Sequence, residues 1–184
     1  MNTWELPVLY WIREHLTCPF FDWLMPAVSA LSAHGEIWIL LAAVLVCVPK
    51  TRRVGLTMGV TLLLGFLIGN VGLKNIIARV RPYDVATDVT LLVERLHDFA
   101  FPSGHTQNIS TTLGAVAAFK KGRARKIICI TVIALVAFSR MYLGVHTPAD
   151  VITSVAIALL LIFVFHPIFK NSIKFTKIVK IVNS

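Results

Sequence analysis

The chain has 184 residues, of which 57% are hydrophobic and 15% are charged, and its formal net charge is +9. Soluble domains carry about a quarter charged residues, and here the apolar residues stand in long blocks rather than in amphipathic stripes. The composition therefore argues against a soluble globular protein and predicts a single membrane domain over residues 1–184.

The first predicted element is an N-terminal interfacial helix over residues 1–17, because aromatic side chains are mixed with charged ones there. Hydrophobic segments follow it, each close to the roughly 20 residues that cross a bilayer core or extendable to that length. In chain order they are residues 19–33, 37–48, 54–73, 106–119, 127–143 and 151–169. The predicted fold class is all-α: a polytopic membrane bundle of about six transmembrane helices.

Basic residues follow the second, fourth and sixth of these segments, in residues 49–53, residues 120–126 and a tail over 170–184. With six spans all three lie on one side, which the positive-inside rule makes cytoplasmic. Both termini are then expected to be cytoplasmic, and residues 74–105 form an extracytoplasmic loop. The net positive charge is interpreted as a topology signal that meets anionic lipids, rather than as a nucleic-acid site.

Glycines recur four residues apart in the third segment, at positions 55 and 59 and again at 65 and 69. Small residues at this spacing let transmembrane helices approach closely. The pattern predicts helix packing rather than chemistry.

A first candidate motif for chemistry is KNIIARVRP, residues 74–82. Lys74 and Arg81 are seven residues apart, which is two helical turns, so a continuous helix would place both cations on one face. Arg79 does not fall on that face, and Pro82 ends the helix. The alternative interpretation is a pair of snorkelling side chains at a helix end.

A second motif is PSGH, which precedes the predicted helix from Thr106 onward. Ser103, Gly104 and His105 are therefore expected at a helix N-terminus, where free backbone N–H groups favour an anion such as phosphate. His105 can exchange a proton near neutral pH. The alternative is a helix cap beside an interfacial histidine.

A third motif is SRMYLGVHTPAD, residues 139–150. Pro148 suits the first turn of a helix, and Asp150 would then reach one ring nitrogen of His146 and direct the other outward. Arg140 closes the preceding span. The alternative is a capping aspartate beside a polar histidine.

Together the three motifs contain the parts of a phosphate-transfer site. Three cations suit phosphate oxygens, and Ser103 and Gly104 add neutral donors. His146 is placed to attack phosphorus, and His105 to protonate the leaving oxygen. The cations are Lys74, Arg81 and Arg140.

These residues resemble the three-part signature of the type 2 phosphatidic acid phosphatase superfamily, which reads K-x6-R-P, P-S-G-H and S-R-x5-H-x3-D. Every defining position is present, in order, between Lys74 and Asp150. The resemblance is to the small bacterial membrane branch. The soluble vanadium haloperoxidases share the signature but lack membrane spans.

The resemblance implies a lipid phosphate hydrolase that works through a phosphohistidine on His146, without a metal or another cofactor. Asp150 would hold the tautomer of His146, and His105 would be the general acid. The phosphate oxygens would be held by Lys74, Arg81, Ser103, Gly104 and Arg140.

The substrate is expected to be a lipid phosphate or diphosphate, with undecaprenyl diphosphate favoured because an outward-facing site suits recycling of the polyprenyl carrier. Phosphatidylglycerol phosphate and phosphatidic acid are alternatives, and a non-catalytic lipid-phosphate binding or transport protein is an alternative of another class. The sequence does not indicate an oligomeric state. The acidic loop over residues 84–98, whose carboxylates form no compact ligand set, is interpreted as a solvated lid.

Overall fold

The computed structural model describes residues 4–33, 35–86, 91–119 and 121–182, with side chains to residue 171. It is helical and contains no strand in those ranges. The helices are α1 (Glu5–Leu16), α2 (Pro19–Ala30), α3 (Gly35–Cys47), α4 (Arg52–Gly65), the π-helix η1 (Phe66–Leu73), α5 (Lys74–Ile77), α6 (Pro82–Val85), α7 (Gly104–Phe119), α8 (Arg123–Tyr142) and α9 (Pro148–Val182). The predicted all-α membrane bundle is confirmed.

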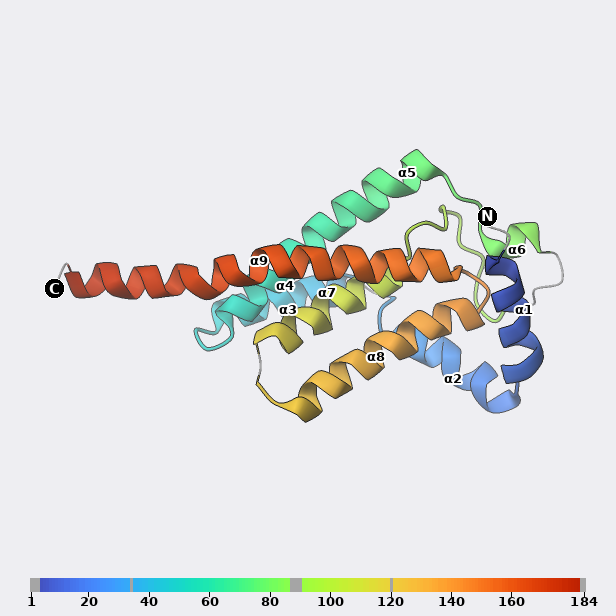
Figure 1. Ribbon diagram of the computed structural model, residues 1–184, viewed down its shortest axis with the longest axis horizontal. Coiled ribbons are helices and arrows are strands. Elements are labelled where there is room, and N and C mark those ends of the chain that lie inside the picture. Colours follow the sequence, from blue (N-terminus) through green and yellow to red (C-terminus); the bar gives the residue numbers. More distant parts are fainter. Residues whose placement is uncertain (1–3, 34, 87–90, 120, 183–184) are drawn as a thin grey trace.

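Helix α7 lies inside the bundle, where it packs against α4, α8 and α9. Helix α3 packs on α4, and α2 packs on α8 (Figure 1). The side of α7 that faces its neighbours carries small and hydroxyl side chains, such as Ala115 and Thr111, which allow close contact. Helix α9 leaves large side chains such as Phe163 exposed, as expected of a surface that meets lipid.

Two stretches are long and apolar enough to cross a membrane by length and composition: residues 52–85, which hold α4, η1 and α5, and residues 148–171 of α9. Helices α2 and α3 meet this test only as a bent pair, because at 12 and 13 residues each rises only about 20 Å, short of the ~30 Å core. The sequence predicts a separate span for each of the two. Six crossings therefore stay a prediction.

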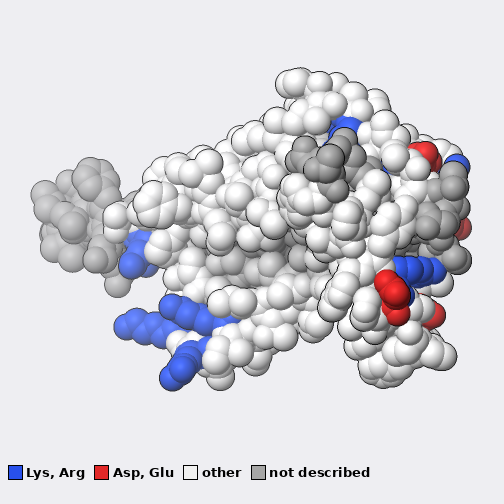
Figure 2. Space-filling model, turned by 45° about the vertical axis from the view of Figure 1, so that its right-hand side comes forward, with Lys and Arg blue, Asp and Glu red and all other residues white. Residues whose placement is uncertain are grey.

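The two ends of the bundle differ in charge. The loop between α3 and α4, the loop between α7 and α8 and the C-terminus lie at one end, here called the basic end (Figure 1). The opposite end, which carries α1 and α6, is called the α6 end. Figure 2 shows basic side chains gathered at the basic end and mixed acidic and basic ones at the α6 end.

The N-terminal helix α1 lies at the α6 end, whereas the C-terminus lies at the basic end (Figure 1). This arrangement does not fit the expectation that both termini are cytoplasmic. The physical reason is the bent pair: when α2 and α3 form one candidate span, the chain starts on the side opposite to the one predicted. The predicted basic tail continues α9 as helix to Val182.

Candidate active site

Lys74 and Arg81 meet at the carboxylate of Asp98. The Lys74 ammonium donates to Oδ2 of Asp98, and Nη2 of Arg81 donates to Oδ1. Both cations are buried, with Arg81 only 2% exposed. The structure thus brings the two ends of the first motif together, as the sequence predicts, around an acidic side chain that the sequence did not single out.

The helical reason for that prediction is wrong. Helix α5 ends at Ile77, because Ala78 adopts the left-handed conformation with φ 46°. Lys74 lies on the helix, whereas Arg81 lies beyond the turn in extended backbone that leads into α6. The two cations therefore converge through a chain reversal and not on one helix face.

Arg81 also connects the first motif to the third. Its Nη1 donates to the carbonyl of Val145 at 2.9 Å and lies 3.4 Å from Nε2 of His146. Its Nε donates to the carbonyl of Asp98 at 2.8 Å. With so many donors engaged, the guanidinium is held rigidly beside the imidazole.

The second motif opens α7 as predicted, with Gly104 the first residue of the helix. The backbone N–H of Ser103 donates to the carbonyl of Asp150 at 3.3 Å, and the hydroxyl of Ser154 donates to the carbonyl of Ser103 at 2.9 Å. A Cβ at Gly104 would lie 3.3 Å from Oδ1 of Asn70, so a larger residue would crowd this approach. The helix N-terminus is thereby fixed against the start of α9.

Arg140 lies in the last turn of α8 and is buried. Its Nη1 donates to the hydroxyl of Ser29 in α2, while its Nε has no hydrogen-bond partner. The carbonyl of Arg140 accepts the N–H of His146 at 3.3 Å. Gly144, at φ 68°, supplies the left-handed turn that brings the chain back to that carbonyl.

His146 lies in this turn and is 1% exposed. Its Nδ1 lies 3.6 Å from Oδ2 of Asp150, which is close but longer than a hydrogen bond. Pro148 begins α9, and Oδ2 of Asp150 accepts the N–H of Thr147 at 2.8 Å. The carboxylate of Asp150 therefore caps the start of α9, as in the alternative interpretation, and also faces His146. A hydrogen bond in which Asp150 orients His146 stays a prediction.

Charge and burial act on His146 together. Burial, followed by the positive charges of Arg140, Arg81 and Lys74, holds the pKa of His146 well below its usual value. The imidazole is thus neutral at physiological pH, and a neutral ring nitrogen has the free electron pair that a nucleophile needs. His105 lies within electrostatic reach of the same three cations and of His146.

Asp98 is the residue of the acidic loop that contacts the site cations, which the sequence did not indicate. The described carboxylates of the loop, those of Asp84, Glu94 and Asp98, are exposed, and a lid over the site stays a prediction. Burial raises the pKa of Asp98, but the hydrogen bonds and charges of Lys74 and Arg81 outweigh it and lower the pKa to about 2. Asp84 pairs with Arg95 at 3.4 Å, and Asp88 lies outside the described residues. The described residues hold no cluster of three or more metal-ligating side chains.

Two further charged residues, Arg79 and Glu5, lie beside the third motif, and the sequence did not predict them there. Nη1 of Arg79 donates to Oδ1 of Asp150 at 2.8 Å, and its Nη2 donates to Oε2 of Glu5 in α1. The helical-phase argument set Arg79 aside, and Glu5 belongs to a helix expected to lie at the other membrane face. The available signal was only that each stands as a charge within an apolar run.

The chain is similar to known proteins over the region that contains the three motifs. A model of the PAP2 superfamily matches residues 53–174. The chain is 34% identical over 125 residues to an undecaprenyl-diphosphatase of Sulfolobus acidocaldarius, a match that covers 66% of this chain and 59% of the relative. It is 37% identical over 100 residues to phosphatidylglycerophosphatase B of Bacillus subtilis, covering 50% and 46%. The chain thus spans less than two thirds of these curated relatives.

The fold is also similar to a solved structure. A crystal structure of a transmembrane PAP2-type phosphatidylglycerolphosphate phosphatase from Bacillus subtilis superposes with a TM-score of 0.71 at 30% identity. The match covers 85% of this chain and 80% of the other. The apolar helices and this transmembrane relative place the chain in a membrane.

Proposed function

We propose that this chain, which belongs to the PAP2 superfamily, is a metal-independent membrane lipid phosphatase that acts through a phosphohistidine. The observation that carries the proposal is convergence: three chain segments bring three cations and two histidines to the α6 end of the bundle. Buried cations are costly unless an anion pairs with them. A phosphate group is the anion that such a set suits.

In the first step, the electron pair on Nε2 of His146 attacks phosphorus. The bond from this phosphorus to the leaving oxygen breaks, and His105 gives that oxygen its proton; in a diphosphate it is the bridging oxygen, and in a phosphomonoester it is the lipid ester oxygen. A bound phosphate offsets the cations around His105 and so favours its protonated form. Asp150 stabilises the positive charge that His146 gains.

In the second step, water attacks phosphorus, the phosphorus–nitrogen bond breaks, and His105 takes a proton from the water. Inorganic phosphate leaves, and both histidines regain their starting state. Through both steps the charge on the equatorial oxygens is balanced by cations and donors fixed in advance. Those groups are Lys74, Arg81, Arg140, Ser103 and Gly104.

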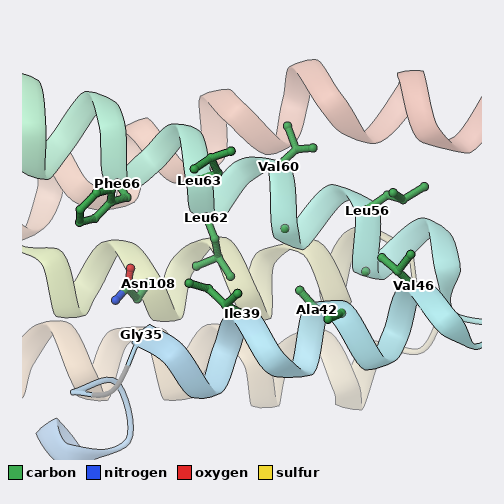
Figure 3. A pocket seen from close by; sticks show the side chains of 13 residues that line it. Gly35, Ile39, Ala42, Val46, Leu56, Val60, Leu62, Leu63, Phe66 and Asn108 are labelled. Atoms are coloured by element: carbon green, nitrogen blue, oxygen red, sulfur yellow. The ribbon is translucent and has the colours of Figure 1, made fainter.

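An apolar groove supports a substrate with a lipid tail. The groove has a volume of about 480 Å³ and lies between α3 and α4, with Asn108 of α7 at one end (Figure 3). Phe66 lines this groove and also a second cavity of about 440 Å³ that Lys74 and Asp98 line. The two cavities thus share Phe66 as a lining residue, and this supports a lipid whose phosphate lies at Lys74 and whose tail follows α4.

Among lipid phosphates, undecaprenyl diphosphate is the favoured substrate. The groove is lined by aliphatic side chains with almost no polar atoms, as a polyprenyl chain requires, and a relative acts on this lipid by name. Phosphatidylglycerol phosphate is the second candidate, since a relative and a structural neighbour carry that activity in their names.

The active site is proposed to face the extracytoplasmic side. The exposed arginines of the basic end, such as Arg123 and Arg125, favour the cytoplasm for that end and for the C-terminus. The site loop over residues 74–105 and helix α1 then lie outside. Impermeant thiol labelling tests this, in a chain whose free cysteines Cys18, Cys47 and Cys129 are replaced by alanine. Of single cysteines placed at Glu14 and at Arg125, only the first is expected to react in intact cells.

The activity is tested by phosphate release in detergent with EDTA. Substrates are undecaprenyl diphosphate, phosphatidylglycerol phosphate and phosphatidic acid, and the variants are His146→Ala and His15→Ala, the latter an exposed histidine of α1. Release that survives EDTA, is kept in His15→Ala and is lost in His146→Ala supports the proposal. Binding of these lipids without release from any of them overturns it in favour of a binding or transport protein.

A further inference from the structure

The charges behind the catalytic motif form one connected network. Glu5 is fully buried, and the side chain of Arg79 is 13% exposed. Arg79 bridges two carboxylates, those of Glu5 and Asp150. Glu5 also accepts the hydroxyl of Thr147 through Oε1 at 2.8 Å. The network joins residues that are 71, 74 and 142 positions apart in the chain.

The network divides the carboxylate of Asp150 into two roles. Oδ1 is taken by Arg79, and Oδ2 accepts Thr147 and faces Nδ1 of His146. A carboxylate held at one oxygen cannot rotate freely, so Arg79 decides which oxygen faces the imidazole. Without Arg79, two buried carboxylates would lose the cation between them, and one would tend to take up a proton.

Glu5 contacts two other members of the network, Arg79 and Thr147. It orients the guanidinium of Arg79 and holds the side chain of Thr147, the residue that follows His146. The hydroxyl of a threonine before a helix usually caps its own helix. Here that hydroxyl donates to Glu5 of α1 instead, so α1 is bound directly to the turn that carries His146.

The backbone places Arg79 for this contact. Ala78 adopts φ 46° and ends α5, which turns the next residue away from the helix. The carbonyl of Arg79 then accepts the N–H of Ala100 at 2.8 Å. Arg79 is thereby fixed between the segment that leads into α7 and the start of α9.

We infer that Glu5 and Arg79 are positioning residues that hold Asp150, and through it His146, in register for attack on phosphorus. This inference rests on the proposed function. It extends the catalytic apparatus to α1, which lies outside the matched residues 53–174. Docking of α1 is then a requirement for turnover and not only for stability.

The kinetic test uses Glu5→Gln, Arg79→Gln and Arg79→Lys in the full chain. Matched controls are Glu14→Gln, on the same helix and 78% exposed, and Arg95→Gln, 63% exposed in the outer loop. Misplacing a reacting group by about 1 Å costs on the order of 100-fold, so kcat is expected to fall about 10- to 100-fold in Glu5→Gln and Arg79→Gln. KM should stay near the wild-type value, and Arg79→Lys should recover part of kcat.

A second measurement does not depend on turnover. Nitrogen NMR of the His146 ring in labelled protein reports which ring nitrogen carries the proton. The wild type is expected to hold the Nδ1–H tautomer that Asp150 stabilises, while Arg79→Gln shifts the ring towards a mixture and Arg95→Gln does not. The elution profile of the detergent complex checks separately that Arg79→Gln is folded.

The outcomes separate the two proposals. If the wild type is active and both kcat and the tautomer are the same in Arg79→Gln as in Arg95→Gln, the positioning inference is overturned. If the wild type releases no phosphate but the tautomer shifts only in the network variants, the network stands and the proposed function fails. A rise in KM alone would make these residues part of substrate binding and would also overturn the inference.

Discussion

The two ends of the bundle use the same residue types for different purposes. At the basic end, Arg123, Arg125 and Lys126 are exposed, and Nη1 of Arg125 donates to the carbonyl of Lys121. At the α6 end, Arg81 and Arg140 are buried. An exposed cation keeps its hydration and costs little free energy, whereas a buried cation needs ion-pair or hydrogen-bond partners.

This difference shows that the burial of the cations, and not how many cations there are, distinguishes the candidate active site. Most of the residues behind the net charge of +9 lie in residues 49–53, residues 120–126 and the tail over 170–184, where they are interpreted as a topology signal. The proposed chemistry uses the smaller buried set. Substitutions matched in type at the two ends test this distinction directly.

The largest expected effect is at Arg81. Arg81→Gln removes donors to Val145 and Asp98 and the charge beside His146. Loss of one fixed transition-state donor costs about 100- to 1,000-fold in kcat, and that loss is expected here. Arg125→Gln, at the basic end, should keep its full rate. Initial rates of phosphate release from the same lipid measure both, and equal rates in the two variants would contradict the comparison.

The next effect concerns the apolar groove between α3 and α4. Leu63→Trp places an indole ring in the groove between α3 and α4. Adding volume to a fitted apolar site is unfavourable. The value of kcat/KM for a long-chain lipid phosphate is therefore expected to fall about 10-fold. Hydrolysis of a short water-soluble phosphate ester should be unchanged. Leu160→Trp, on the exposed face of α9, is the matched control. Equal losses on both substrates would show that the groove does not hold the tail.

The helix starts at the site were predictable because their signals are local. A proline at the first turn predicts the start of α9, which begins at Pro148. The Pro-Ser-Gly turn predicts a helix from Thr106 onward, and α7 begins two residues earlier, at Gly104. The residues that these starts carry, His105, His146 and Asp150, were found for the same reason. The turn residues determine the backbone at these positions, and this does not depend on long-range contacts.

The rest of the site was not predictable because it depends on one unusual backbone angle and on long-range packing. Nothing about an alanine signals the left-handed turn at Ala78, yet this turn ends α5 early and directs Arg79 to Asp150. Glu5 was placed at the wrong end because α2 and α3 look like two spans by hydropathy. Their pairing into one bent candidate span is a property of the packed bundle.

A smaller effect is expected at Asp98, whose carboxylate lies on Lys74 and Arg81 where a phosphate would bind. Asp98→Asn removes this competing anion, so KM and the inhibition constant for inorganic phosphate should each fall a few-fold. Asp84→Asn, which affects only the pairing with Arg95 among the ion pairs of the described residues, is the control. A higher KM in Asp98→Asn would instead give Asp98 a part in substrate binding.

The same pair of variants has an acid signature. Because the pKa of Asp98 in the folded protein is lowered to about 2 from 3.8, its contribution to stability is complete above that unfolded value and is lost as the pH falls towards 2. Wild type should therefore lose thermal stability over this window more steeply than Asp98→Asn does. About half of the Asp98 side chain is exposed, so the difference is expected to be modest.

The last prediction tests what holds the basic end, where close helix contact replaces the charge network of the α6 end. A Cβ at Gly55 would lie 2.6 Å from the backbone nitrogen of Val46 in α3, so Gly55→Ala must separate α3 from α4. A Cβ at Gly59, one turn on, would lie 3.7 Å from Cβ of Ala42, an ordinary contact. Overpacking costs about 1–3 kcal/mol, so Gly55→Ala is expected to lower the unfolding temperature in detergent and Gly59→Ala to leave it unchanged.

The kinetics of these glycine variants complete the contrast between the two ends. Gly55→Ala should keep the wild-type kcat per folded molecule for a short water-soluble phosphate ester, because the separation occurs at the end of the bundle away from His146. A long-chain lipid is not used for this comparison, because Gly55 also lines the groove between α3 and α4. Phosphate release divided by the folded fraction, measured from the elution profile of the detergent complex, checks this. A fall in kcat to the level of the charge-network variants would mean that the two ends are coupled through α4, since α4 leads through η1 to Lys74.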